Sequence, residues 1–258
     1  MLSLLFALLD RFLVPAPPEA RVGWLCGKTY AHRGLHGNGV PENSPTAFAL
    51  AIERSLGIEC DVQRTADGQA VVFHDWDLER LTGRTGAVID QRAEDLARIP
   101  LTGSTDTIPT IRQFLDQVAG RAPVLIEIMS KRDIRVSPLC LAVRRALEGY
   151  QGQVAVMSFD PRVSRWFGRY SPRIVHGIVV TEEGKRTLLA TLKLHLAFWE
   201  ARPQFLAWDV RDLPSKFVAT QRWRGFPVLT WTVRSAELAQ RAADCADGPI
   251  AEGAGLAA

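Results

Sequence analysis

Short runs of apolar, β-forming residues alternate along this chain with longer stretches of helical periodicity. Eight of these runs are candidate strands, at residues 29–31, 58–62, 70–73, 124–128, 154–158, 174–180, 205–210 and 227–233. Several are continuously apolar, as expected of parallel strands that are covered on both faces. In a chain of 258 residues this alternation predicts an α/β protein with a (β/α)8 TIM-type barrel, and a doubly wound open sheet is the alternative.

Helical patterns fill most of the gaps between these runs, at residues 46–55, 110–118, 138–147, 161–170, 183–196 and 235–243. The first of these helices has Ser44 as its expected cap and Pro45 at its first position. The connection 64–69 contains an Asp-Gly pair and is too short for a crossover helix, so it predicts a hairpin turn. The connection 75–107 is long, and we therefore expect a small insertion after the third strand.

The N-terminal segment predicts a short apolar helix and a proline-rich linker at residues 1–22, followed by a barrel domain at residues 23–258. The apolar run is broken by Asp10 and Arg11, and it is shorter than the roughly 20 residues that a transmembrane helix needs. No basic residue precedes it, although a signal peptide typically has one. The alternatives are a helix packed on the domain, a peripheral membrane contact through residues 1–14, and a cleaved signal.

The formal net charge of +3 does not indicate nucleic-acid binding, so the expected partner is a small-molecule substrate. The four cysteines are scattered without a C-x-x-C pair, which predicts free, buried thiols in a reducing compartment. We therefore expect a cytoplasmic protein, with association to a membrane as the variant that the N-terminal segment allows.

Two carboxylates, Glu59 and Asp61, alternate with apolar residues in the second candidate strand. Residues i and i+2 of a strand face the same side, so both carboxylates project together and repel one another unless a proton or a cation lies between them. Oxygen ligands of this kind suit Mg²⁺ or Ca²⁺. The alternative is a pair of carboxylates that is salt-bridged to neighbouring arginines.

A third carboxylate, Glu127, lies inside the apolar run 124–128, where a buried charge is costly without a partner. Near the carboxyl end of a barrel strand it would face the same mouth as Glu59 and Asp61. Convergence of three carboxylates favours a divalent metal site, and a buried ion pair with Arg or Lys is the alternative.

Two histidines, His32 and His74, each follow a strand-like run and so are expected at the mouth of the barrel. A lone histidine is more often structural, but two at matching strand ends beside carboxylates favour a general acid and a general base. Arg33 can hold a phosphate through two hydrogen bonds, and Gly34 lets the backbone approach closely.

The loop residues Glu42 and Asn43 come just before the first helix of the expected barrel. Asn43 is a good capping residue, which is its structural interpretation. The functional interpretation places Glu42 and Asn43 against the substrate or the metal, and we predict that both take part in substrate binding.

A collinear set of motifs between residues 29 and 130 resembles the glycerophosphodiester phosphodiesterase family. These motifs are His32-Arg33-Gly34, Pro41-Glu42-Asn43-Ser44, Ala47-Phe48, Glu59-Cys60-Asp61-Val62, Thr65-x-Asp67-Gly68, Val71-Val72-Phe73-His74-Asp75, Leu78-x-Arg80-Leu81-Thr82 and Ile108-Pro109-Thr110. The resemblance implies a (β/α)8 barrel with an insertion after the third strand. It also implies hydrolysis of glycerophosphodiesters to sn-glycerol 3-phosphate and an alcohol, with Mg²⁺ or Ca²⁺ as the cofactor.

By position, the resemblance implies roles for individual residues. His32 and His74 match the acid–base pair of the family, and Arg33 and Glu42 match residues around the phosphate and the metal. The implied metal ligands are Glu59, Asp61 and Glu127. The implied mechanism uses a glycerol hydroxyl of the substrate as the nucleophile, forms a cyclic phosphate and opens it with water.

The chain departs from the family at two places. Met129 stands where the family usually has a lysine, two residues after the third metal ligand, and Lys131 lies near. The C-terminal segment 246–253 is a compressed version of the family's last strand. Trp231 is expected either to stack against the glycerol or alcohol moiety or to be a plain core tryptophan.

These departures leave two alternatives to the glycerophosphodiesterase. One is a phosphodiesterase or lyase that acts on lysophospholipids at a membrane. The other is a catalytically weakened barrel that binds glycerophosphodiesters, for which Met129 is the main support.

Overall fold

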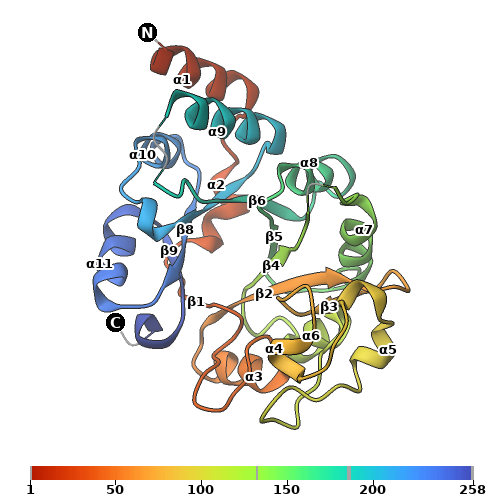
Figure 1. Ribbon diagram of the computed structural model, residues 1–258. Helices are drawn as coiled ribbons and strands as arrows, with labels where there is room; N and C mark the ends of the chain where they lie inside the picture. Colours follow the sequence, from red (N-terminus) through yellow and green to blue (C-terminus); the bar gives the residue numbers. More distant parts are fainter. Residues whose placement is uncertain (1, 132, 185–186, 257–258) are drawn as a thin grey trace. The chain divides into compact units, whose positions relative to one another are not determined.

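The computed structural model describes residues 2–131, 133–184 and 187–256, and they divide into two compact units. The central unit comprises Thr29–Ala155, and the terminal unit comprises Met1–Lys28 together with Val156–Ala258. Strands and helices follow one another in the order of a (β/α)8 barrel, so the predicted fold class is confirmed (Figure 1).

The central unit is built around β2, Gly57–Arg64. Its further elements are β1 Tyr30–Ala31, α3 Pro45–Glu53, β3 Ala70–Val72, α4 Glu79–Thr82, α5 Ala93–Leu96, α6 Ile111–Val118, β4 Val124–Ile128 and α7 Ser137–Ala146, with the short 3-10 turn Val88–Asp90. β2 pairs in parallel with β1 and β4 and antiparallel with β3. The expected cap of α3 is confirmed, because Ser44 Oγ accepts a hydrogen bond from the Ala47 amide at 3.1 Å and Pro45 follows it.

The insertion after β3 has a hydrophobic cluster of its own, which includes Phe73, Leu78, Val88 and Leu96. All four side chains are buried. The small insertion that the long connection predicts is therefore confirmed, and it is ordered around α4 and α5.

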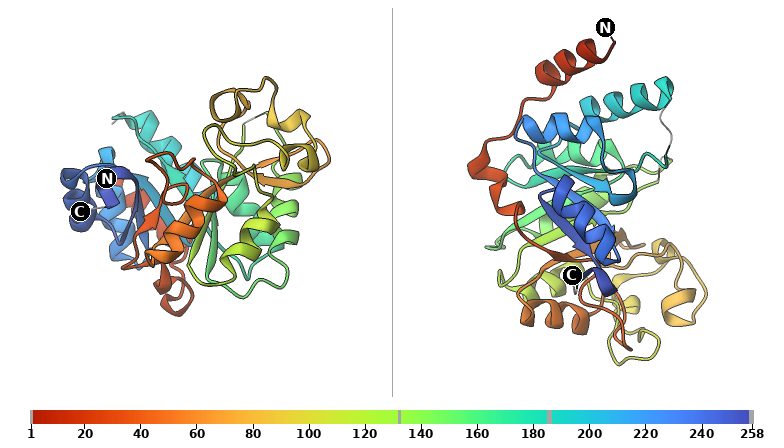
Figure 2. Two further views of the ribbon diagram at one scale, coloured as in Figure 1. Left: turned by 90° about the horizontal axis from the view of Figure 1, so that it is seen from below. Right: turned by 90° about the vertical axis from the view of Figure 1, so that its left-hand side faces the viewer.

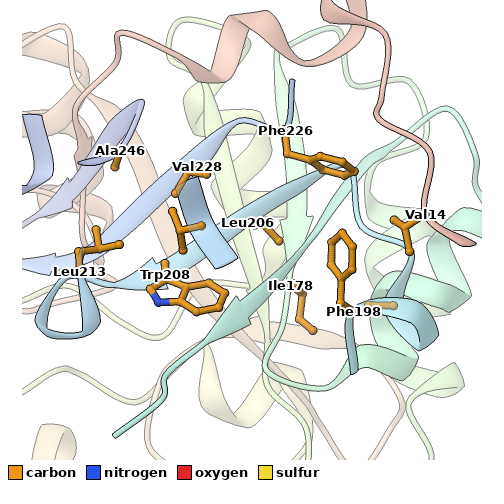
Figure 3. Close-up of a cluster of buried hydrophobic side chains, with 11 residues drawn as sticks. Val14, Ile178, Phe198, Leu206, Trp208, Leu213, Phe226, Val228 and Ala246 are labelled. Atoms are coloured by element: carbon orange, nitrogen blue, oxygen red, sulfur yellow. The ribbon is translucent and has the colours of Figure 1, made fainter. Parts of the chain in front are cut away.

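The terminal unit contains a parallel sheet of four strands in the order β6, β7, β8, β9. Its elements are α1 Leu2–Leu13, α2 Glu19–Val22, α8 Pro161–Tyr170, β6 Val175–Val180, α9 Leu188–Ala201, β7 Phe205–Asp209, α10 Lys216–Trp223, β8 Val228–Val233, α11 Ala236–Cys245 and β9 Gly248–Ala251, with 3-10 turns at Gly23–Leu25, Val210–Asp212 and Gly253–Leu256. β5, Val154–Met157, spans the boundary between the two units. Figure 3 shows the core of the unit, where Phe198, Trp208 and Phe226 pack with Val14 from the N-terminal segment.

All eight candidate runs form strands, but they are not the eight parallel strands of the barrel, because the sheet contains a ninth strand. The run 70–73 forms β3, which is antiparallel to β2 and so is not one of the parallel barrel strands. The eighth parallel strand is β9, which pairs with β8. The sequence pattern did not predict β9, because this strand has four residues and two of them are Gly248 and Pro249. Glycine and proline are disfavoured in β-strands.

Two helical assignments also need correction. The pattern 183–196 begins too early, because Glu183 and Gly184 have positive φ angles of 47° and 69°, which a right-handed helix does not allow. α9 instead starts after the Thr187 cap and continues to Ala201. α10 was not predicted. The four cysteines are free, as expected, although Cys26 is exposed and Cys245 is only partly buried.

The N-terminal helix α1 is held in the terminal unit by the buried carboxylate of Asp10. Asp10 Oδ1 lies 2.8 Å from His195 Nδ1 and accepts a hydrogen bond from Trp199 Nε1 at 2.7 Å. Asp10 Oδ2 accepts a third hydrogen bond from Gln221 Nε2 at 2.9 Å. Of the alternatives for the N-terminal segment, the structure therefore shows a helix that packs on the domain. None of the described helices has the length and apolar character needed to cross a membrane.

Replacing Asp10 with alanine is expected to lower the free energy of unfolding by about 2–4 kcal/mol, because it leaves two buried groups and one partly buried group without their charged acceptor. Chemical denaturation followed by circular dichroism measures this loss. The matched control is Arg11→Ala, an exposed neighbour whose removal should cost less than about 0.5 kcal/mol. Equal effects of the two substitutions would contradict the anchoring role of Asp10.

Candidate functional site

Three carboxylates converge in the central unit, as the strand pattern predicts. Glu59 and Asp61 lie on β2, and Glu127 lies on β4, where the parallel register sets it beside Asp61. Glu59 and Asp61 are buried and Glu127 is partly buried, and their ligand oxygens all lie within 4.8 Å of one another. The alternation of β2 places both of its carboxylates on the face that Glu127 shares.

The electrostatics of this cluster favour a bound cation. Burial raises the pKa of Glu59 well above its usual range, and the charges of Asp61 and Glu127 raise it further. Burial and Asp61 likewise raise the pKa of Glu127. Glu59 Oε1 is buried without a hydrogen-bond partner among the residues that the structure describes. A hard divalent cation takes oxygen ligands and would satisfy this oxygen, so the three residues fit Mg²⁺ or Ca²⁺.

Arg33 lies between these carboxylates and Glu42. Its amide donates to Glu59 Oε2 at 2.9 Å, its Nη1 donates to Glu42 Oε1 at 2.7 Å, and its Nε lies 3.2 Å from Asp61 Oδ2. One cation beside two buried carboxylates does not neutralise the cluster of three. The alternative of a plain salt-bridged pair therefore accounts for only part of the negative charge.

The loop before α3 reaches the cluster through backbone conformations that are unusual for residues with side chains. Arg33 and Asn43 have positive φ angles of 55° and 54°. In this conformation Asn43 Nδ2 donates to Asp61 Oδ2 at 2.9 Å, and Asn43 Oδ1 accepts from the Asp61 amide at 3.3 Å. Gly34 is needed for close packing, because a Cβ there would lie 2.9 Å from Ala47 Cβ. Asn43 thus orients Asp61 and does not cap the helix, a role that Ser44 takes.

A second ionic network carries His74. Its Nδ1 lies 2.8 Å from Asp75 Oδ1, and Arg80 donates to both oxygens of Asp75. The hydrogen bond from Arg80 lowers the pKa of Asp75 to about 2, against the effect of burial. Asp75 is therefore ionised at neutral pH and can only accept, so the Nδ1 atom of His74 carries the hydrogen and Nε2 is left to exchange a proton.

Glu42 joins the two networks. Its carboxylate accepts hydrogen bonds from Arg33 and, at 2.8 and 3.0 Å, from Arg80. Burial raises the pKa of Glu42, but the two arginines outweigh it and lower the pKa to about 2. Glu42 is thus a fixed anion between the carboxylate cluster and the His74 segment.

His32 lies close to Glu59. Its Nε2 is 4.0 Å from Glu59 Oε2. Both predicted acid–base histidines are therefore linked to the carboxylate cluster, His32 directly and His74 through Asp75, Arg80 and Glu42. Their chemical roles remain predictions.

Three further residues support the site, and none of them was assigned a role from the sequence. Asp75 and Arg80 form the ionic support of His74. Gln63 Nε2 donates to the carbonyl oxygens of Phe73, His74 and Asp75, at 3.0, 2.9 and 2.6 Å. The signal for Gln63 was its position two residues after Asp61 on the same face of β2, and Arg80 was marked only by its motif.

Met129 lines a cavity of about 100 Å³ in the central unit, where the family usually has a lysine. Trp76, Ile89 and Ile134 contribute apolar surface to the same cavity. Lys131 lies elsewhere on its wall, with Nζ 4.3 Å from the centre of the Trp76 ring. The amine of Lys131 therefore stacks on the ring of Trp76.

Trp231, the remaining predicted substrate-binding residue, lies on β8 of the terminal unit. Its Nε1 donates to the Ala207 carbonyl at 3.1 Å, and its ring packs edge-on against Phe159 at 5.3 Å. Phe159 is exposed, so this aromatic pair is open to solvent on one side. The predicted contact of Trp231 with substrate stays a prediction.

Comparison with known proteins agrees with this chemistry. The family model described as the Glycerophosphoryl diester phosphodiesterase family matches residues 32–247, which is most of the chain. A glycerophosphodiester phosphodiesterase of Bacillus altitudinis is 36% identical over 158 residues, covering 57% of this chain and 64% of the relative. A probable glycerophosphodiester phosphodiesterase of Mycobacterium tuberculosis is 29% identical over 247 residues, covering 88% of this chain and 87% of the relative.

The match to the first relatives is partial. The chain spans less than two thirds of their length, at 64% for the Bacillus altitudinis protein and 65% for the glycerophosphodiester phosphodiesterase of Caldanaerobacter subterraneus.

Two solved structures share the fold. A phosphodiesterase of Oleispira antarctica, in complex with the product sn-glycerol-3-phosphate, superposes with a TM-score of 0.77 at 19% identity, covering 89% of this chain and 94% of the other. A putative glycerophosphoryl diester phosphodiesterase of Silicibacter pomeroyi superposes with a TM-score of 0.76 at 22% identity, covering 92% and 95%. At this level of identity the likeness supports the fold.

Proposed function

This chain belongs to the glycerophosphoryl diester phosphodiesterase family, and on that premise we propose that it hydrolyses glycerophosphodiesters to sn-glycerol 3-phosphate and an alcohol. The observation that carries the proposal is the carboxylate cluster of Glu59, Asp61 and Glu127, with Arg33 at its edge. One buried oxygen of this cluster has no hydrogen-bond partner within the described part of the chain. The product named in the Oleispira antarctica structure supports the same reaction.

Glu59, Asp61 and Glu127 are the residues that would hold a divalent metal, Mg²⁺ or Ca²⁺. The metal would supply positive charge against the phosphate oxygens as charge develops on them. Asn43 orients Asp61 and so positions one of the proposed ligands. Arg33 lies next to the cluster with a guanidinium that can bind a phosphate oxygen.

His32 and His74 are the proposed acid and base. In the first step one neutral imidazole accepts the proton of a glycerol hydroxyl, whose oxygen attacks phosphorus to form a cyclic phosphate. The bond from phosphorus to the alcohol breaks, and the other imidazole, as imidazolium, donates a proton to the leaving oxygen. In the second step the histidine that donated a proton accepts one from water, and the water oxygen attacks phosphorus. The bond from phosphorus to the glycerol oxygen breaks, and the other histidine returns its proton to that oxygen, which yields sn-glycerol 3-phosphate and restores both histidines.

Asp75 and Gln63 position this chemistry without touching the reacting atoms. Asp75 holds the tautomer of His74, and Gln63 holds the backbone on which His74 lies. The predicted substrate-binding residues also include Glu42, Asn43 and Trp231. Glu42 would act indirectly, because it orients the side chains of Arg33 and Arg80.

One observation favours a second candidate function, the phosphodiesterase or lyase acting on lysophospholipids. Met129 and its apolar neighbours line a cavity where a lysine would place a charge. An apolar wall of this kind suits a lipid substrate better than a polar head group. The four free cysteines support the cytoplasm as the proposed compartment.

The test is the release of glycerol 3-phosphate from glycerophosphocholine and glycerophosphoethanolamine in the presence of Mg²⁺, Ca²⁺ or EDTA. We expect release that requires one of the metals and is lost in Asp61→Asn. Release that is indifferent to EDTA would contradict the metal site. Metal-binding protein that releases product only from lysophospholipid would favour the second candidate. Protein that binds glycerophosphodiesters without cleaving them would indicate a barrel whose catalytic activity is weakened.

A further inference from the structure

The N-terminal helix α1 exposes a row of large apolar side chains. Leu5, Leu8 and Phe12 follow one another at spacings of three and four residues, which places them on one face of the helix. They are 53%, 67% and 85% exposed. The opposite face carries Asp10, which is buried in the terminal unit.

Helix α9 exposes a second row. Leu188, Leu189, Leu192 and Leu196 are between 39% and 71% exposed. Of the twelve large apolar side chains that are exposed in the described part of the chain, seven lie on α1 and α9. This concentration is not expected of a random scatter of surface leucines.

The two helices lie side by side in the terminal unit, as Figure 1 and the right view of Figure 2 show. The ring of Phe6 on α1 stacks on His195 of α9, with ring centres 4.4 Å apart. Trp199 of α9 donates to Asp10 of α1. The two apolar rows are therefore carried by two helices in direct contact. We call their exposed apolar residues the α1–α9 surface, and the buried Asp10 links the two helices.

Basic charge accompanies this surface. Arg11 on α1 and Lys193 on α9 are exposed beside the apolar rows. The terminal unit contains 17 Lys and Arg against 12 Asp and Glu, whereas the central unit contains 14 against 16. The basic surplus of the whole chain therefore belongs to the unit that carries the surface.

An exposed tryptophan marks the carboxyl end of α1. Trp223 is 85% exposed, and the next residue, Arg224, donates hydrogen bonds to the carbonyl oxygens of Asp10 and Val14. Tryptophan is enriched where proteins meet the head-group region of a bilayer.

We propose that the α1–α9 surface docks on an anionic phospholipid membrane, with both helices lying in the plane of the interface. Apolar rows flanked by Lys and Arg are typical of helices that insert among lipid head groups. A second copy of the chain fits this surface less well, because two such surfaces face to face would bring like charges together. The sequence alone suggests a membrane contact through residues 1–14, and the proposal adds the exposed leucines of α9 to that contact.

The test is co-sedimentation of the full chain with vesicles of phosphatidylcholine and of an equimolar mixture of phosphatidylcholine and phosphatidylglycerol. The α1 variant is Leu8→Glu with Phe12→Glu, and the α9 variant is Leu189→Glu with Leu192→Glu. Wild type should bind the mixed vesicles, more weakly at high salt. Each variant should lower the partition coefficient about tenfold or more.

The matched control is Tyr170→Glu, an exposed aromatic residue on α8 of the same unit, which should bind like wild type. Melting curves establish that each variant is folded. Wild type that does not sediment with the mixed vesicles would overturn the proposal, as would an α9 variant that binds like wild type. A wild-type dimer that both variants convert to monomers would overturn it in favour of an interface between copies. Vesicle binding is measured without substrate, so its result is independent of the proposed activity.

Discussion

Replacing His74 with alanine is expected to lower kcat for glycerophosphodiester hydrolysis by about 10²–10⁴-fold, the usual contribution of a general acid or base. The fold should survive, because the His74 side chain is 32% exposed and its contact with Asp75 lies near the surface. His32→Ala should have an effect of the same order. The measurement is steady-state release of glycerol 3-phosphate at saturating metal, with circular dichroism to verify folding.

A graded series sharpens this test. Asp75→Asn removes the charge that fixes the tautomer of His74, and it should lower kcat less than His74→Ala does. The matched control is Asp77→Asn, two residues further on, where the exposed side chain accepts a hydrogen bond from the Glu79 amide. Activity of His74→Ala close to wild type would remove the acid–base assignment. Equal losses in Asp75→Asn and Asp77→Asn would remove the positioning role of Asp75.

Replacing Glu59 with glutamine is expected to raise Tm in EDTA at neutral pH by about 2–5 °C and to abolish stabilisation by a divalent metal. The pKa of Glu59 is raised in the folded protein by burial and by Asp61 and Glu127. A raised pKa means that ionisation favours the unfolded chain, so this group costs stability as the pH rises through its folded pKa. Glutamine removes the cost, whereas in the wild type a bound divalent metal would offset it.

Glu42→Gln is the matched contrast, because the pKa of Glu42 is lowered to about 2. Its ionised form therefore stabilises the fold above the unfolded pKa, and this contribution is lost as the pH falls toward 2. Glu42→Gln should destabilise the protein by roughly 1–3 kcal/mol at neutral pH. Thermal melts in EDTA and in Mg²⁺ or Ca²⁺ measure both variants. A lower Tm for Glu59→Gln in EDTA would contradict the repulsion on which the metal site is argued.

The carboxylate cluster could be predicted from the sequence because strand periodicity is a local rule. Glu59 and Asp61 alternate with apolar residues, and Glu127 stands in a run that otherwise belongs in a core. The parallel register of β2 and β4 then brings Asp61 and Glu127 together. The capping role of Ser44 could be predicted equally well, since a cap and the proline that follows it act within one helical turn.

The supporting network could not be predicted, because it depends on how loops fold back. Glu42 meets Arg80 across 38 positions of the chain, and Gln63 reaches three carbonyl groups of another segment. The positive φ of Arg33 is not signalled by a glycine or asparagine. For β9, a short strand with Gly248 and Pro249 has too little pattern of its own, and its place is set by pairing with β8.

The insertion after β3 uses different side chains for its own packing and for the cavity that it helps to line. The insertion has its own buried cluster, and it also supplies Trp76 and Ile89 to the cavity beside Met129. Side chains facing that cavity can therefore change without disturbing the packing that keeps the insertion folded. Arg80 has a different role, since its bonds to Glu42 and Asp75 tie the insertion to the segment that carries His74. The lining of the cavity and the position of His74 are thus set by different residues of one insertion.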